Sequence, residues 1–509
     1  MCRWVWRLAR AKAGARRIDG LLVTSPPADD LQALAKGGRA NIAGFFVRLI
    51  ARIPFLIIGG RWYGADALGR LAYAIIVVEF AAQIATLGLK RGLALHLAGD
   101  GKENGAWDAV LLVLAATIIP TATLMLVPAI MFPNSHINGL DNMLPLIIPA
   151  LALSDVMLAA LAYRFDVGAT VRARAIIEPW TISIMAFALA WALPRDGLLI
   201  AYAVSMAAAL IASLVPFLKS YGLPKGWTPR LAELYRLARR NAPLAAADAL
   251  EWASRRLDIA ILGLFVSPAT VGIYWVAQQI ASLAQKLKTS FDPVLGPVIT
   301  RRLDEGDRAA VARQISQVGF WILAAQAGIA LTLGIPAEAL LGLVGPKSAF
   351  VAGTGALACL LLAEVVASPA VVSEAALVYV ARYRNMLVSL AMIGVQAALS
   401  LLLVTLLKSR GFNEAWQAAG VAAALAVALA LGSLVKSRLA AQLLGAPVNV
   451  WRWPIVMAAA AAVIVGQIAI RLPEWAELLF GMPAILGVYC WLVWQRGFNA
   501  EDRMLLRKS

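Results

Sequence analysis

Residues 40–60 read ANIAGFFVRLIARIPFLIIGG, an apolar stretch long enough to cross a membrane that nevertheless contains Arg48 and Arg52. An arginine near the middle of a bilayer costs at least ~2.5–3.5 kcal/mol, so its side chain faces water or a partner rather than lipid. The pattern returns later in the chain, where Arg255 lies in another apolar stretch. A chain that accepts this cost twice is typical of a transporter with a cationic cavity between two lobes.

The composition predicts a polytopic α-helical membrane protein, because 61% of the residues are hydrophobic and only 15% are charged. Apolar runs long enough to cross a bilayer as a helix recur along the whole chain. We expect about fourteen spans, at roughly 41–59, 67–89, 106–131, 143–163, 174–193, 197–218, 242–265, 268–290, 314–335, 351–379, 385–407, 415–435, 454–470 and 477–495.

The net charge of +17 is explained by topology rather than by nucleic acid. With the N-terminus inside, about 35 of the 46 Lys and Arg residues fall on the cytoplasmic side of these spans and about 7 fall outside. The positive-inside rule then puts both termini in the cytoplasm, in a bacterial inner membrane. The basic segment 1–40 has no apolar core, so we expect an interfacial helix that contacts anionic membrane lipid rather than a signal peptide.

The chain divides into two halves that echo each other. A glycine follows Arg52 and Arg255 by 17 residues, at Gly69 and Gly272. Six helices per half is an even number, which predicts parallel repeats related by an axis along the membrane normal. We expect an N-lobe at 41–218, a basic amphipathic linker helix on the membrane surface at 219–241, a C-lobe at 242–435, two additional helices at 436–495, and a basic cytoplasmic tail at 496–509.

The arginines of the first span have no acidic residue on their own helix. They therefore bind an anion or pair with acids of the same half. The candidate partners are Glu79, Asp155 and Glu178. Under the second alternative, these residues form internal ion pairs that hold the N-lobe together.

The seventh span carries Asp248, Glu251, Arg255 and Asp258 at intervals of three, four and three residues, which makes one polar stripe along the helix. Arg256 points about 100° away from that stripe. Glu251 and Arg255 are one turn apart and can pair within the helix. Three acids to one arginine still leave surplus negative charge, which favours coordination of Na⁺ or binding of H⁺ as a coupling ion.

A guanidinium group matches phosphate oxygens with two parallel hydrogen bonds and stays charged at any working pH. Arginines from both lobes therefore suit a substrate with a phosphate or pyrophosphate group, such as a lipid pyrophosphate with a sugar head. Enzymatic signatures are missing: the sequence has no Walker A, His-Glu-x-x-His or Gly-x-Ser-x-Gly motif, and its three cysteines share no spacing. We expect neither an enzyme nor a resident cofactor or metal.

The chain resembles the Wzx-type polysaccharide flippases of the multidrug/oligosaccharidyl-lipid/polysaccharide exporter superfamily over about residues 40 to 495. The resemblance rests on the fourteen-helix layout and on four segments: Arg52 to Tyr73, Arg255 to Tyr274, Asp292 to Asp307 and Leu343 to Gly345. It implies two six-helix lobes that flip a polyprenyl-pyrophosphate-linked oligosaccharide by alternating access, alongside polysaccharide-assembly proteins. The pyrophosphate site would fall on Arg48, Arg52, Arg255 and Arg256, and the ion site on Asp248, Glu251 and Asp258.

Three other functions remain open at this level. The peptidoglycan lipid II flippase also has fourteen helices and a cationic cavity. Multidrug exporters of the same superfamily usually have twelve helices and acidic pockets for cations. An enzyme acting on lipid-linked glycans would need a large external loop, and the predicted external loops are short.

Overall fold

The computed structural model describes residues 52–98, 104–289, 299–300, 302–303, 305–499 and 502. Every regular element within these ranges is a helix, which confirms the predicted all-α class. Nine of the described helical segments are long and apolar enough to cross a membrane, and the shorter helix Pro454–Ala469 is also apolar. The chain is a multi-pass membrane protein.

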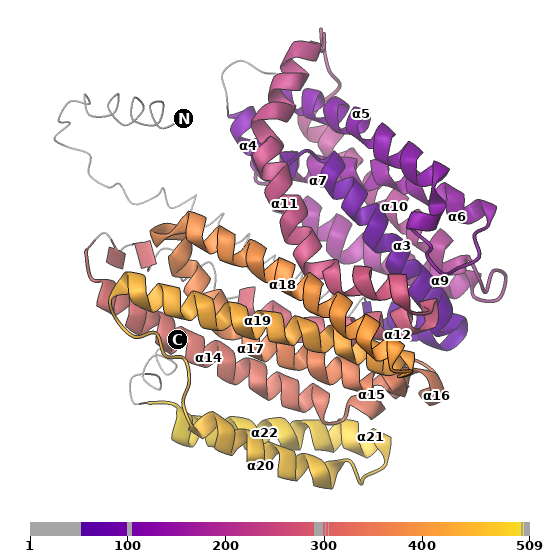
Figure 1. The fold of residues 1–509 in the computed structure, drawn as a ribbon. Coiled ribbons are helices and arrows are strands. Elements are labelled where there is room, and N and C mark those ends of the chain that lie inside the picture. The colour runs from indigo at the N-terminus through magenta and orange to yellow at the C-terminus, as the bar shows by residue number, and fades with distance from the viewer. Residues whose placement is uncertain are drawn as a thin grey trace.

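The first lobe contains the helices coloured from indigo to magenta in Figure 1. Its long helices are apolar and rich in Ala, Leu and Ile, and short π-helical or 3₁₀ turns interrupt several of them. We call this part the N-lobe, and its main helices are α3 (Gly64–Ala85), α4 (Leu89–Leu97), α5 (Gly105–Leu126), α7 (Ile147–Tyr163), α9 (Glu178–Leu189) and α10 (Gly197–Tyr221).

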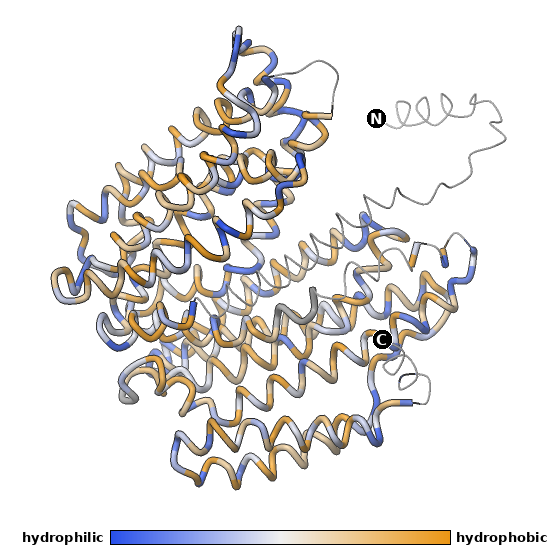
Figure 2. The backbone as a smooth tube through the Cα atoms, turned by 180° about the vertical axis from the view of Figure 1, so that it is seen from behind, coloured by the Kyte–Doolittle hydropathy of each residue, from blue (hydrophilic) through white to orange (hydrophobic). Residues whose placement is uncertain are grey.

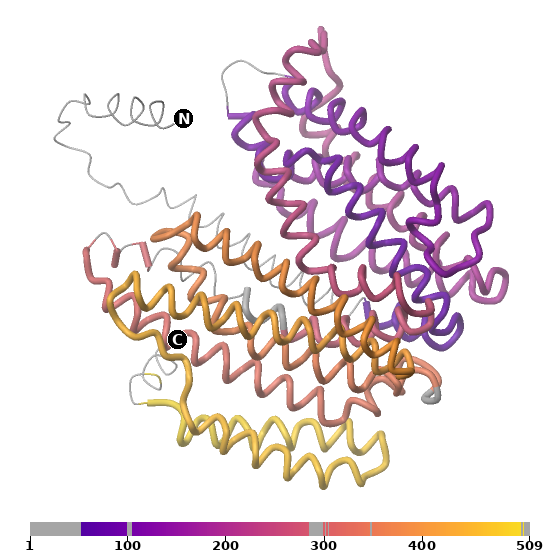
Figure 3. Tube along the Cα trace, viewed as in Figure 1, coloured from indigo at the N-terminus to yellow at the C-terminus, as the bar shows by residue number. Residues whose placement is uncertain are grey.

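The second lobe is drawn in pink, salmon and orange, except for its first helix, which is magenta and runs along the N-lobe, and a yellow pair of helices covers its outer side (Figure 3). The C-lobe consists of α11 (Leu231–Phe265), α12 (Pro268–Thr289), α14 (Arg308–Gly334), α15 (Ala337–Val344), α17 (Thr354–Val380), α18 (Arg382–Ser409) and α19 (Glu414–Leu444). The pair consists of α20 (Pro454–Ala469) and the segment Glu474–Gly497, whose central part is α22 (Met482–Leu492). It packs on α14 through a separate apolar cluster that includes Phe320 and Tyr489.

Thirteen of the predicted spans coincide with described helices to within a few residues at most boundaries, and most of the first span, with Arg48, lies outside the described residues. The separate linker helix is wrong. Residues 222–230 form a loop, and the rest of the predicted linker continues without a break into the seventh span as the 35-residue helix α11, with Pro243 inside it. The charged segment between the predicted spans 67–89 and 106–131, which those spans leave as a connecting loop, contains the helix α4. The N-terminal segment 1–40 and nearly all of the C-terminal tail lie outside the described residues.

The two lobes contact each other at one end and diverge toward the other (Figure 1). We call the first the joined end, where the starts of α3 and α12 pack together, and the second the α4 end, where α4 and the start of α11 lie. The helix α11 belongs to both lobes by its contacts: it packs on α3, α4 and α5, and also on α12, α18 and α19.

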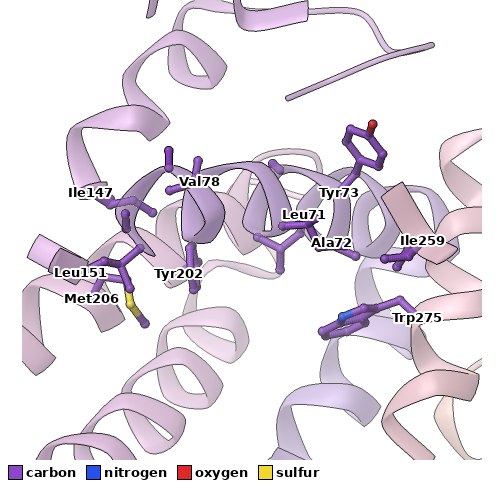
Figure 4. Packing of buried hydrophobic residues seen from close by; sticks show 14 of the residues in the cluster. Leu71, Ala72, Tyr73, Val78, Ile147, Leu151, Tyr202, Met206, Ile259 and Trp275 are labelled. Carbon is purple, nitrogen blue, oxygen red and sulfur yellow. The ribbon is translucent and has the colours of Figure 1, made fainter. Parts of the chain in front are cut away.

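A single apolar core runs through both lobes where they join. Figure 4 shows α3 between two groups of buried residues. Ile147 and Met206 of the N-lobe lie on one side, and Ile259 and Trp275 of α11 and α12 lie on the other. The helix α3 is thus the main element through which the N-lobe contacts the C-lobe.

Hydrophilic residues gather at the ends of the helices, and hydrophobic ones line their lengths (Figure 2). The helices α11 and α12 are exceptions, since neither is among the nine described segments that meet the length and composition of a span. Both carry polar side chains in their middle turns. A polar helix at the centre of a membrane protein faces water or polar partners. The helices α11 and α12 therefore indicate that a polar functional site lies between the lobes.

Candidate functional site

The polar stripe of α11 has buried side chains at its two ends and exposed side chains between them. Asp248 and Asp258 are buried, whereas about half of the Arg255 side chain and 44% of the Glu251 side chain are exposed. The exposed pair lies in the middle of the helix, between the two buried acids. A charged pair exposed at this depth faces an aqueous region, because hydrocarbon would not solvate it.

Arg91 of α4 forms ion pairs with two acids of α11, Asp248 and Glu251, and the sequence of α11 alone does not reveal this partner. Its Nη2 lies 2.5 Å from Glu251 Oε2, and its Nε lies 2.9 Å from Asp248 Oδ1. Arg255 Nη2 lies 2.9 Å from the other oxygen of Glu251. Glu251 therefore bridges two arginines, one from each of two helices. We call Arg91, Asp248, Glu251 and Arg255 the α4–α11 clamp.

The clamp changes the charge count on which the coupling-ion prediction rested. Within α11 alone, three acids face one arginine, but Arg91 brings the cluster to two acids and two arginines. Asp248 and Glu251 are therefore neutralised in this conformation. Sequence reasoning missed Arg91 because it sits in a segment expected to be a loop, although the alternation of apolar and basic residues in 89–97 indicates an amphipathic helix.

Asp258 has a different environment from the other two acids of the stripe. It is 1% exposed, and Tyr274 of α12 donates a hydrogen bond to its Oδ2 over 2.7 Å. Gln278, one turn further along α12, donates to the same oxygen over 3.2 Å. No basic side chain of the described residues forms an ion pair with Asp258. Its carboxyl group is held by neutral donors and is shielded from both lipid and water.

In the N-lobe, two of the three candidate acids pair with residues other than the arginines of the first span. Asp155 of α7 contacts Arg174, and Lys90 Nζ lies 3.1 Å from its Oδ2. Arg174 Nη1 also lies 2.8 Å from Glu178 Oε2. These contacts tie α4, α7 and the start of α9 together. Asp155 and Glu178 therefore form ion pairs within the N-lobe.

Glu79 is the acid around which predicted arginines gather. Tyr202 of α10 donates a long hydrogen bond of 3.5 Å to its Oε1. Arg256, Arg52 and Arg174 are the cations near enough to act electrostatically on the Glu79 carboxylate, although none of them forms an ion pair with it among the described residues. Arg52 itself is exposed, and no described residue forms an ion pair with it. The structure therefore brings Arg52 and Arg256 toward one acid of α3, while Arg255 faces Glu251.

An aromatic pair lies beside these charges. The rings of Phe80 and Trp252 stack with centroids 5.1 Å apart, and they join α3 to α11 next to Glu79 and Glu251. Within the described ranges, no set of three or more His, Cys, Asp and Glu side chains is arranged to hold a metal ion. The region between α3, α4 and α11 thus offers guanidinium groups, carboxylates and stacked rings as its chemistry.

At the joined end the lobes are held by contacts to backbone oxygens. Asn134 donates to the carbonyl groups of Gly263 and Val266, each over 3.3 Å, and Arg61 donates to Leu343 over 3.2 Å. Tyr73 of α3 donates to Ala260 of α11 over 3.3 Å. These bonds connect residues that are far apart in the sequence, so they close this end of the molecule.

A family model described as polysaccharide biosynthesis protein matches residues 61–342, which is more than half of the chain. The chain belongs to this family. No curated protein sequence matches it significantly. The family match runs from just before α3 into α15, and it contains the clamp together with Glu79 and Arg256, whereas Arg52 lies before it.

Solved structures share its fold at low sequence identity. A lipid II flippase MurJ in an inward closed conformation has a TM-score of 0.66 at 12% identity, over 89% of this chain and 97% of that one. An inward-facing MATE family multidrug transporter of the MOP superfamily has a TM-score of 0.59 at 13% identity, over 78% and 94%. An outward-facing one has a TM-score of 0.51 at 14% identity, over 81% and 96%. These likenesses show that the chain has the fold of MurJ and of the MATE family transporters.

Proposed function

We propose that this protein is a transporter that flips a polyprenyl-pyrophosphate-linked oligosaccharide across the bacterial inner membrane by alternating access. The observation that carries the proposal is the half-exposed Arg255 in the middle of α11, next to Arg256 in the sequence. Guanidinium groups that face water at this depth match a pyrophosphate group better than a cationic drug. Arg48 belongs to the same proposed set, although it lies outside the described residues.

The arrangement of the lobes supports a state that is open toward the α4 end. The joined end is closed by contacts to backbone oxygens, and the lobes diverge from there toward the α4 end (Figure 1). We infer that the α4 end faces the cytoplasm, as the distribution of basic residues predicts, with both termini on that side. A lipid-linked sugar made in the cytoplasm would then approach from the open side.

We further propose that transport is coupled to Na⁺ or H⁺ and that Asp258 is the acid that binds it. Asp248 and Glu251 are neutralised in the α4–α11 clamp. Asp258 is held by Tyr274 and Gln278, which are neutral, so its carboxyl group remains free to exchange a proton or a cation for their hydrogen bonds.

The proposal is tested by binding and by transport. Purified Arg255→Ala and Arg256→Ala proteins should bind undecaprenyl pyrophosphate more weakly than wild type, because each charge-assisted contact is worth about 1.5–3 kcal/mol. Lysine at the same positions keeps the charge but loses the two-pronged geometry, so binding should fall only partly. Arg313→Ala, which removes an exposed arginine from α14, is the matched control.

The corresponding test in cells scores the leaflet in which lipid-linked oligosaccharide accumulates after deletion of the gene. Accumulation on the cytoplasmic side is expected. Wild-type affinity for undecaprenyl pyrophosphate in both alanine variants, measured on folded protein, would refute the role of the arginines.

Flipping of lipid II is the second candidate function, because the likeness to the MurJ structure covers 97% of the MurJ chain and 89% of this one. The two substrates share the pyrophosphate and the lipid tail and differ in the head group. Competition between undecaprenyl pyrophosphate carrying a neutral oligosaccharide and lipid II carrying a peptide would separate them: preference for lipid II would replace the first proposal. Binding of a lipophilic cation in place of either lipid would favour a small-molecule exporter.

A further inference from the structure

A groove opens on the outer side of the N-lobe at the α4 end, away from the clamp. It encloses about 480 Å³ between the turn that follows α7, the start of the π-helical segment Arg172–Ile177, and the last turns of α10. The end of α10 lies at this end of the molecule, since Trp107 of α5 donates to Gly222 just after it. The groove therefore lies at the level where helices leave the membrane. Its lining residues are Asp166, Arg172, Val215, Pro216, Lys219 and Ser220.

The charge on the groove wall is positive. Arg172 and Lys219 line it, and Lys219 is exposed and has no ion-pair partner among the described residues. Arg164 stands at the rim, where its guanidinium group stacks on the Tyr221 ring at 3.9 Å and donates to the carbonyl group of Ser220. Arginine stacked in this way keeps its full charge.

The single acid of the groove is largely taken up by other contacts. Asp166 accepts a hydrogen bond from the backbone of Ala169 over 3.0 Å, which caps the short helix α8 (Val167–Val171). It also lies 3.6 Å from Arg172. Arg172 and Lys219 in the wall and Arg164 at the rim outnumber Asp166, so the net charge of these four residues is +2 and favours an anionic group in the groove.

An apolar surface adjoins these cations. Phe165 is 78% exposed and has a φ of 62°, a left-handed conformation that is a true outlier for a bulky residue. Val215 in the groove wall is 46% exposed, and Pro216 lies beside it. A strained turn that holds an aromatic ring outward is explained when the ring inserts among lipid chains, because transfer of its surface from water offsets the strain.

We propose that this groove binds an anionic phospholipid, with its phosphate held by Arg172 and Lys219 and its chains against Phe165 and Val215. A phosphate next to an apolar surface is the chemistry of a phospholipid, and basic pockets between helices at the cytoplasmic side are typical sites for anionic head groups. The excess of cations selects an anionic lipid over a zwitterionic one. The site is independent of the substrate region, which lies between α3, α4 and α11.

The test uses the purified full-length protein in a neutral detergent, titrated with phosphatidylglycerol and with phosphatidylcholine, and counts bound lipid by native mass spectrometry. Wild type should retain phosphatidylglycerol at concentrations where phosphatidylcholine does not bind. The double variant Arg172→Gln/Lys219→Gln should bind phosphatidylglycerol roughly 30-fold more weakly, on the scale of about fivefold for each basic residue at a membrane surface. Phe165→Ser, which leaves the charge unchanged, should weaken it severalfold.

The matched control is Arg313→Gln/Arg438→Gln, which removes two exposed arginines from the C-lobe and should leave phosphatidylglycerol binding unchanged. An equal loss in the control would show general surface attraction and overturn the site. Undiminished binding in Arg172→Gln/Lys219→Gln would overturn it as well. Should millimolar inorganic phosphate displace the lipid while Phe165→Ser has no effect, the groove is a phosphate site and the lipid assignment is wrong. If the double variant unfolds, Lys219→Gln alone serves the same comparison, because Lys219 is exposed and unpaired among the described residues.

Discussion

Gly69 of α3 and Gly272 of α12 pack against each other's backbone at the joined end. A Cβ atom added to Gly69 would lie 1.7 Å from the Pro268 carbonyl oxygen and 2.7 Å from the Gly272 nitrogen. A Cβ atom on Gly272 would lie 2.1 Å from the Ala65 oxygen and 2.8 Å from the Gly69 nitrogen. The contact is reciprocal, as expected where two equivalent elements meet across a twofold axis. The glycines that mark the repeat in the sequence are thus the point where the halves touch.

Gly69→Ala should separate the lobes at the joined end. The Pro268 carbonyl oxygen, which the new Cβ atom would meet, cannot move without its helix. The substitution should therefore cost about 1–3 kcal/mol of stability, the usual range for overpacking. Thermal unfolding of the purified protein measures the loss. Gly394→Ala in α18 is the control, since a Cβ atom there meets nothing within 4 Å. Equal melting temperatures for Gly69→Ala and wild type would mean that the lobes do not meet here.

Arg91→Ala should loosen α4 from α11 and leave Asp248 buried without a cation. Because Arg91 is itself half exposed, we expect a loss of about 1–3 kcal/mol, below the range for a fully buried ion pair. Adding Asp248→Asn should recover part of this loss, since the uncompensated charge is then gone. A double-mutant cycle on unfolding free energies checks it. Strictly additive effects of the two substitutions would contradict the contact between these side chains.

Asp258→Asn should stop ion-dependent transport and leave the fold nearly intact. The amide oxygen still accepts hydrogen bonds from Tyr274 and Gln278, whereas the site loses its charge. Transport assays at varied Na⁺ concentration and pH, together with melting temperatures, give the two readouts. Glu251→Gln serves as the comparison, because its charge is engaged in the clamp. Normal ion dependence in Asp258→Asn would assign coupling to another residue.

The docking of Asp502 should weaken in acid. Burial favours its neutral form, but hydrogen bonds from Arg452, Gln317 and the Asn499 backbone outweigh that effect and hold the pKa of Asp502 below its usual value. A folded pKa below the unfolded one of about 3.9 means stabilisation that is present above that value and lost as pH falls through the folded pKa.

The measurement compares melting temperatures of wild type and Asp502→Asn as the pH is lowered. The asparagine variant should be less stable near neutral pH, because Arg452 Nη1 loses the carboxylate that lies 2.7 Å away. The gap between the two proteins should shrink in acid. A gap that stays constant down to the lowest pH at which both fold would contradict the ionised role of Asp502.

The helices of this fold can be predicted from the sequence because the signal is local. Apolar runs of the right length located the described spans, and the spacing of Asp248, Glu251, Arg255 and Asp258 placed them correctly on one helix. The predicted helix boundaries were wrong where the hydropathy of the sequence changes but the helical backbone continues. The basic start of α11 reads as a separate surface helix, although its hydrogen bonds continue through to Phe265.

The partners of the charged residues could not be predicted, since they come from distant segments. Arg91 and Glu251 are 160 positions apart, and neither residue's neighbours indicate the other. Arg174, which takes Asp155 away from the arginines of the first span, is only 19 positions from it but lies in a different helical element. Periodicity shows which face of a helix is polar. It does not show which helix lies opposite.

The continuity of α11 has a mechanical consequence. A helix of 35 residues is a rod about 50 Å long, and it is fixed to the N-lobe by Arg91 and to the C-lobe by Lys408, which donates to the Phe265 carbonyl group over 3.0 Å. When the lobes rock about the joined end, they pull on α11 from both of its ends, so that α11 acts as a lever between them. α11 can relieve this strain by bending at Pro243, where a backbone hydrogen bond is missing, or by breaking the ion pairs of Asp248 and Glu251 with Arg91. An anion that competes with Glu251 for Arg255 and Arg91 would therefore act on the lever itself.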